Sequence, residues 1–204
     1  MGIIAILLVA IVPAVNSLSK SGGRKATASL LLGGIEQARA QAIKDGRATY
    51  LAFAAHPTDK KSAITDQKIL DRYFYHSFAI FEDDVDPTKP KVQITPWKIF
   101  PTGISLRTEI SFSTPAGSSN SSNASWSSTD FGFAPASSAA EMFPYMKFDE
   151  SGTLSAPTAL NPGPILLRFF EGFVNGTNEK PTTAQNKDEI ISVAATTGRA
   201  TYVP

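Results

Sequence analysis

Few side chains of this chain are suited to acid–base or metal chemistry. The 204 residues include no cysteine and only two histidines, His56 and His76, which excludes thiolate zinc sites and cysteine nucleophiles. His56 precedes Pro57 in an expected loop, and His76 lies in an aromatic segment. Neither has a serine–carboxylate constellation near it in the sequence, which favours packing or surface roles. We therefore expect neither catalysis nor a cofactor.

An acidic run is the one candidate metal site. The sequence reads Glu82-Asp83-Asp84, and Asp86 follows two residues later. Calcium binds several carboxylate oxygens at once, which makes Asp83, Asp84 and Asp86 its candidate ligands. Their spacing fits no EF-hand loop. A solvated loop between strands is the interpretation that we favour.

Isolated arginines are the candidate phosphate contacts. Arg199, together with Arg47 and Arg168 on other expected strands, has the charge for such a contact. Nineteen Lys and Arg residues against eighteen Asp and Glu residues give a formal charge of +1, whereas nucleic-acid binders usually carry a clear basic excess. The balance argues against a nucleic-acid partner, and pairing of these arginines with carboxylates is the expected arrangement.

The N-terminal segment is apolar without interruption. Met1–Val15 contains no polar side chain, and the first charge in the chain is Lys20. A transmembrane helix needs about 20 apolar residues, more than this run supplies. A secretory signal needs a basic segment before the run and a small-residue cleavage site after it. Nothing basic precedes Gly2, and residues 13–17 make a poor cleavage site. The third interpretation is the second half of a longer apolar helix.

The elements that follow are expected to change from helix to strand. Apolar residues recur at spacings of three and four and form one stripe of an expected helix, which ends at a capping glycine, Gly46. The members of this stripe are Ala28, Leu31, Leu32, Ile35, Ala38, Ala42 and Ile43. Residues 16–23 read as a flexible junction because they are rich in Ser and Gly. Alternating patterns then predict strands at 47–54, 69–81, 92–100, 104–112, 145–148, 165–170, 190–194 and 200–203.

These elements predict an α+β fold, in which a long helix packs on an antiparallel sheet. The helix has an apolar half and an amphipathic half. We divide the chain into 1–23, the apolar assembly helix with its junction, and 24–204, the head. Seven of the eleven residues from Ser118 to Ser128 are serine, so 114–140 is expected to be a mobile insertion.

The order of several short motifs resembles the type IV pilin-like proteins, in particular minor pseudopilins of the type II secretion H-type and FimT-like minor pilins. The apolar start up to Pro13 is similar to the second half of the family's N-terminal helix. Further similarities are the helix end at 38–43, the strand–turn at 97–104, the turn at 148–152 and the closing hairpin at 191–199. They extend over most of the chain.

Two features depart from the family. The basic leader, the processing glycine and the "FTLIE"-like mature start are not in the sequence, and alignment on Pro13 places Met1 roughly nine residues into the mature helix. FimT-like proteins that bind DNA carry a "GRxR" motif, whereas this chain reads Gly198-Arg199-Ala200-Thr201. The second arginine and its phosphate contact are therefore missing.

The resemblance implies a non-enzymatic fibre subunit, with its head in the periplasm or in an extracellular fibre. It would be anchored in the inner membrane by a single pass before assembly, and processed by a prepilin peptidase if a leader lies upstream. Its partners would be other pilins or pseudopilins, bound through the helix positions Ile3, Ile4, Ile6, Leu7, Leu8, Ile11, Val12 and Pro13. The alternatives are a DNA-binding minor pilin, with Arg199 as the contact, and a membrane-tethered module that binds a secreted substrate or glycan.

Overall fold

The computed structural model describes residues 2–55, 67–85, 91–107, 125–127, 140–142, 144–156, 164–175, 178–182 and 187–203. Of the first range, side chains are described from Gly22 onward.

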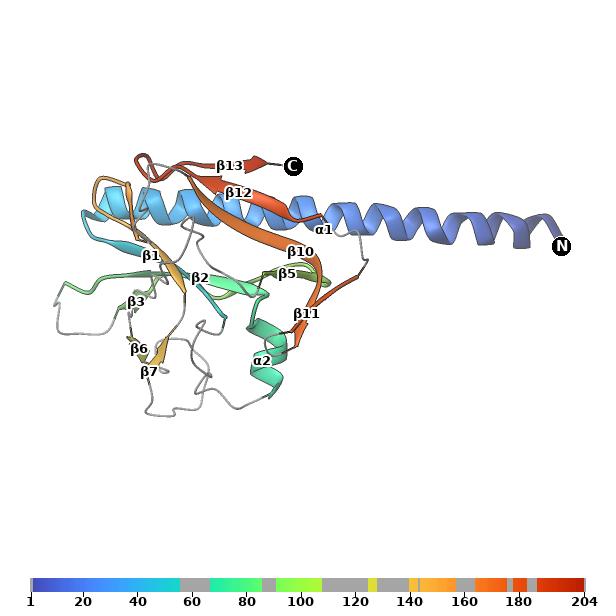
Figure 1. The fold of residues 1–204 in the computed structure, drawn as a ribbon, viewed down its shortest axis with the longest axis horizontal. Coiled ribbons are helices and arrows are strands. Elements are labelled where there is room, and N and C mark those ends of the chain that lie inside the picture. Colours follow the sequence, from blue (N-terminus) through green and yellow to red (C-terminus); the bar gives the residue numbers. More distant parts are fainter. Residues whose placement is uncertain are drawn as a thin grey trace.

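A single long helix, α1 (Gly2–Asp45), begins the chain. At 1.5 Å per residue its 44 residues extend for about 66 Å. Lys44 lies in the last turn, and Gly46 follows with a φ of 59°, the left-handed conformation of a glycine cap. The helix is continuous through the predicted junction at 16–23. Figure 1 shows that its N-terminal half extends beyond the rest of the molecule.

The strands form two main antiparallel sheets. In order, the first contains β3 (Val92–Gln93), β2 (Ser77–Glu82), β1 (Thr49–Phe53), β8 (Tyr145–Phe148) and β9 (Leu154–Ala156), and β4 (Lys98–Ile99) also pairs with β2. The second contains β11 (Asn178–Pro181), β10 (Ile165–Asn175), β12 (Glu189–Val193) and β13 (Ala200–Val203), and β5 (Ile104–Leu106) also pairs with β10. β6 (Ser125–Ser127) lies within the predicted insertion at 114–140 and pairs with β7 (Ala140–Met142), which begins at its last residue.

The main core lies between α1 and both sheets. The predicted helical stripe supplies buried side chains, among them Leu31 and Ile35, and the inner faces of the sheets meet it with large apolar residues. From the first sheet these are Leu51, Phe53, Phe78 and Ile80, and from the second Leu167, Phe169, Ile191 and Val193. A second cluster covers the other face of the first sheet, where Tyr50, Phe81 and Tyr145 pack with Phe74 and Tyr75.

The predicted α+β, pilin-like fold class is wrong. Most of the regular structure in the described ranges after α1 is antiparallel strand, and it is divided between two sheets rather than gathered in one. The physical reason lies in β10. This strand buries Ile165, Leu167 and Phe169 in the main core and pairs with β5, β11 and β12, so the C-terminal strands form a sheet of their own.

The strand predicted at 69–81 is partly a helix. Gln67–Tyr73 forms α2, and the strand β2 starts only at Ser77. Tyr75 ends the helical segment with a φ of 61°, and its amide donates to the carbonyl of Ala54 at 2.6 Å. Phe74 and Tyr75 therefore lie in the same cluster, although strict alternation would have put them on opposite faces.

The membrane prediction is contradicted as well. Within the part of the chain that the structure describes, no helix combines the length and the apolar character needed to cross a bilayer. The expected single-pass inner-membrane location is therefore wrong.

Candidate functional site

The predicted assembly residues lie on the part of α1 that extends from the body. The backbone of all eight, from Ile3 to Pro13, is helical, and Figure 1 shows this part of the helix beyond the sheets. Their side chains lie outside the described part of the chain. The structure therefore gives these positions one continuous helical backbone, joined to the helix segment that packs in the main core.

The acidic run is held by ion pairs and hydrogen bonds. The Asp83 carboxylate accepts from Tyr50 Oη at 3.0 Å and from Lys91 Nζ. Arg47 Nη2 lies 2.8 Å from Glu82 Oε1, and Arg47 Nη1 donates to the Asp83 carbonyl at 3.0 Å. Among the described residues, no group of three or more His, Asp or Glu side chains is placed to hold a metal ion. Asp84 is described in that same loop, and Asp86 lies outside the described ranges.

The three arginines differ in their surroundings. Arg47 pairs with Glu82, the arrangement expected from the sequence. Arg168 and Arg199 are exposed on the second sheet and on the turn before β13. Arg199 is the candidate phosphate contact. Its backbone is held in the turn, because its carbonyl accepts a hydrogen bond from the amide of Ala194 at 2.9 Å.

The structure places one histidine beside a serine that is distant in the sequence. Ser105 Oγ lies 3.2 Å from His76 Nδ1. However, Nδ1 also lies 2.9 Å from the carbonyl oxygen of Ile104, which can only accept, so this nitrogen carries the proton. The Ser105 hydroxyl in turn donates to the Gly172 carbonyl at 2.9 Å. The pair is therefore arranged for structure and not for proton abstraction, and His56 lies outside the described residues.

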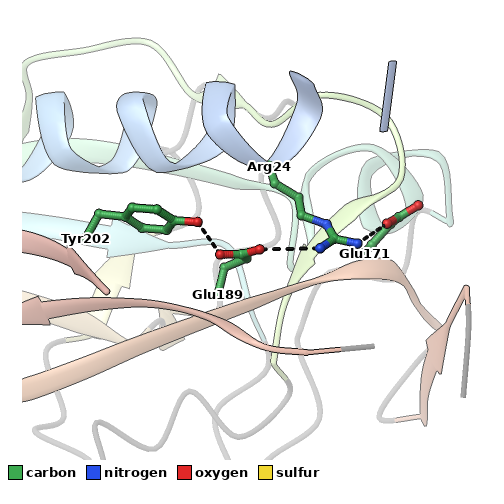
Figure 2. Close-up of polar contacts among 4 residues, drawn as sticks. All are labelled: Arg24, Glu171, Glu189 and Tyr202. Carbon is green, nitrogen blue, oxygen red and sulfur yellow. Dashed lines mark hydrogen bonds and ion pairs between the residues drawn. The ribbon is translucent and has the colours of Figure 1, made fainter. Parts of the chain in front are cut away.

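A charged cluster, which we call the junction cluster, joins α1 to the second sheet. It consists of Arg24 on α1, Glu171 on β10, Glu189 on β12 and Tyr202 on β13 (Figure 2). Arg24 Nη2 donates to Glu171 Oε2 at 2.6 Å, and Arg24 Nη1 donates to Glu189 Oε1 at 3.4 Å. Tyr202 Oη donates to the other oxygen of Glu189. Two neighbouring strands, β10 and β12, thus bond one guanidinium group, and β13 joins the cluster through Glu189.

The electrostatics of the junction cluster favour its charged form. The hydrogen bond that Arg24 donates to Glu171 is the main cause that raises the pKa of Arg24, and burial only partly opposes it. The hydrogen bond to Glu189 raises the pKa of Tyr202 to about 12. At neutral pH the cluster therefore holds one cation, two carboxylates and a neutral phenol that donates. The side chains of Glu171 and Glu189 are only 11% and 13% exposed, so solvent screens these pairs less than pairs on an open surface.

A second ion-pair group lies on the same sheet. Arg107 Nε donates to Asp188 Oδ1 at 2.9 Å, and its other nitrogens bond Asp188 and Glu179. The guanidinium carbon lies 4.4 Å from the centre of the Phe170 ring, within the range of a cation–π contact. The group ties the segment after β5 to β11 and to the start of β12.

Sequence reasoning missed both groups. Arg24 and Arg107 are single arginines whose acidic partners lie 72 to 165 positions away in the chain, and no local spacing relates them. The only local sequence signal for the junction cluster was the position of Arg24, between the Ser- and Gly-rich residues 16–23 and the amphipathic stripe of α1. The described side chains of both groups hold α1 or the segment after β5 against strands of the second sheet.

Comparison with protein-family models, curated proteins and solved structures finds no match to this chain. The resemblance to pilin-like proteins therefore stays a prediction.

Proposed function

We propose that this chain is a structural subunit of a type II secretion or type IV pilus-like fibre, as minor pilins and pseudopilins are. It assembles with related subunits through the N-terminal half of α1. The observation that carries this proposal is the division of α1 into two parts. Its C-terminal half lies in the main core, whereas its N-terminal half extends from the body (Figure 1).

The composition of the extended half supports assembly. Met1–Val15 has no polar side chain, and apolar surface left in water is unfavourable by about 25 cal/mol per Å². Identical helices packed side by side remove that surface from water. Each Leu or Ile that becomes buried contributes about 1.5–3 kcal/mol, so a contact between two helices needs only a few such residues.

Self-association of the full chain tests the proposal. The chain has no cysteine, so single-cysteine variants report contacts directly. We expect Ile4→Cys and Leu8→Cys to give disulfide-linked dimers under mild oxidation, because four-residue spacing puts both positions on one helix face. Thr196→Cys, on an exposed turn of the body, is the matched control and should remain monomeric.

A charge on the same helix face should weaken this association. We expect Ile4→Asp with Leu8→Asp to reduce self-association at least 10-fold in sedimentation experiments, since each substitution removes more than 1.4 kcal/mol of apolar contact. A full chain that stays monomeric at every accessible concentration would contradict the proposal.

A further inference from the structure

The junction cluster lies where α1 leaves the body. Among the described side chains of α1, Arg24 is the most N-terminal one that bonds a strand. A Cβ atom added at Gly23 would still lie within 3.6 Å of Ile104, whereas one added at Gly22 would meet nothing within 4 Å. Within the described side chains of α1, bonding to the strands therefore begins in the turn that holds Gly23 and Arg24.

From this geometry we infer that the junction cluster fixes the direction of the extended half of α1, with Arg24 as the positioning residue. The guanidinium bonds carboxylates on two neighbouring strands, β10 and β12. Two fixed partners restrain rotation of the helix as well as its distance from the sheet, because the guanidinium is a rigid planar fork. The hydroxyl of Tyr202 holds Glu189 from the third strand.

The length of the extended half makes this restraint matter. About 22 residues precede Arg24, and at 1.5 Å per residue they reach about 33 Å from it. A tilt of about 10° at the cluster therefore moves the far end of the helix by about 6 Å. The consequence for assembly rests on the proposed function, but the restraint on the helix stands without it.

Distance measurements between two spin labels test the restraint. Labels at Ser17→Cys on the extended half and Thr196→Cys on the body report the direction of α1 in the full chain, diluted with unlabelled protein. We expect a narrow distance distribution for the parent protein and one at least twofold broader for Arg24→Ala. Lys25→Ala, an exposed neighbour, is the control and should leave the width unchanged.

Two further variants separate positioning from loss of stability. Arg24→Ala leaves two nearly buried carboxylates without their cation, so it also lowers the unfolding temperature. Arg24→Lys keeps the charge but reaches only one carboxylate at a time, and we expect a width between those of the parent and Arg24→Ala. Glu171→Gln with Glu189→Gln removes both ion pairs while it leaves Arg24 in place, and it should broaden the distribution too.

The outcomes distinguish this inference from the proposed function. If Arg24→Ala and the double Gln variant both keep the parent's narrow distribution, the inference is overturned. If the distribution broadens as expected but the parent protein never self-associates, the proposed function fails and the positioning role of Arg24 holds. If both hold, Arg24→Ala should also reduce disulfide-linked dimers of the Ile4→Cys chain at least threefold.

Discussion

At the scale of single residues, one carboxylate organises the turn between β8 and β9. Asp149 Oδ1 accepts from the amides of Ser151 and Thr153, both at 3.0 Å, and from the Ser151 hydroxyl at 2.6 Å. Burial disfavours the charge on Asp149, but the hydrogen bonds from Ser151 and Thr153 outweigh it and lower the pKa of this carboxyl. The same turn contains Gly152, whose backbone approaches Ile43 of α1.

Replacement of this carboxylate should have an effect that depends on pH. Because the folded pKa of Asp149 lies below its ordinary value of 3.8, its stabilisation is present above that value and is lost as the pH falls through the folded pKa. We expect Asp149→Asn to lower the free energy of unfolding by about 1 kcal/mol at pH 7 and by progressively less as the pH falls below 3.8. Urea unfolding across this range measures the difference, and a difference that is the same at every pH would contradict the expectation.

At the scale of elements, the close packing of α1 against β2 depends on a glycine, Gly34, which has no side chain to separate them. Gly34 is buried, and a Cβ atom added there would lie 2.5 Å from Cε2 and 2.7 Å from Cζ of Phe78. The Phe78 ring cannot easily give way, since its centre lies 5.9 Å from that of Phe100 and 6.5 Å from that of Phe53. The preceding Gly33 is exposed and would meet nothing within 4 Å.

The two neighbouring glycines form a matched pair for mutagenesis. We expect Gly34→Ala to destabilise the protein by about 1–3 kcal/mol, because the new methyl group overpacks the contact with Phe78. Gly33→Ala should stabilise it by up to about 1 kcal/mol, because alanine has the higher helix propensity and its methyl group meets open space. Urea unfolding of both variants checks the opposite signs, and equal shifts would show that the contact with Phe78 is not tight.

At the scale of the whole molecule, the main core and the extended helix are separate. The buried stripe of α1 begins at Ala28, and the strands that pack on it all follow Gly46. At the far end of the body, Arg39 Nε donates to the Thr197 carbonyl at 2.8 Å, which holds the turn before β13 against α1. The body therefore has its core contacts without the residues that extend from it.

Removal of residues 1–20 should accordingly leave the body folded. We expect the shortened chain to keep its strand signal in circular dichroism and an unfolding midpoint close to that of the full chain, because the described residues of the main core begin at Ala28 and are all retained. It should also be a monomer in sedimentation experiments. Loss of the folded signal would show instead that the first 20 residues belong to the body.

Local patterns in the sequence predicted several elements well. The helical stripe is confirmed from Ala28 to Ala42, but its predicted last member, Ile43, is 47% exposed. The glycine cap at Gly46 and the strands at 145–148 and 200–203 are also confirmed, because period and turn chemistry act between residues that are close in the chain. The same patterns failed at 69–81. There an aromatic run suits a strand by composition, but Tyr75 adopts a positive φ and Gln67–Tyr73 is helical.

Only the tertiary structure decided how the strands divide and which charges meet. The sequence by itself determined a long N-terminal helix, an apolar start and a series of strands, since each depends on neighbours along the chain. The separation into two sheets depends on pairings such as β5 with β10, which join residues more than 60 positions apart. The junction cluster depends on the same long-range folding, because Arg24 meets Glu171 and Glu189 only when α1 and the second sheet are packed together.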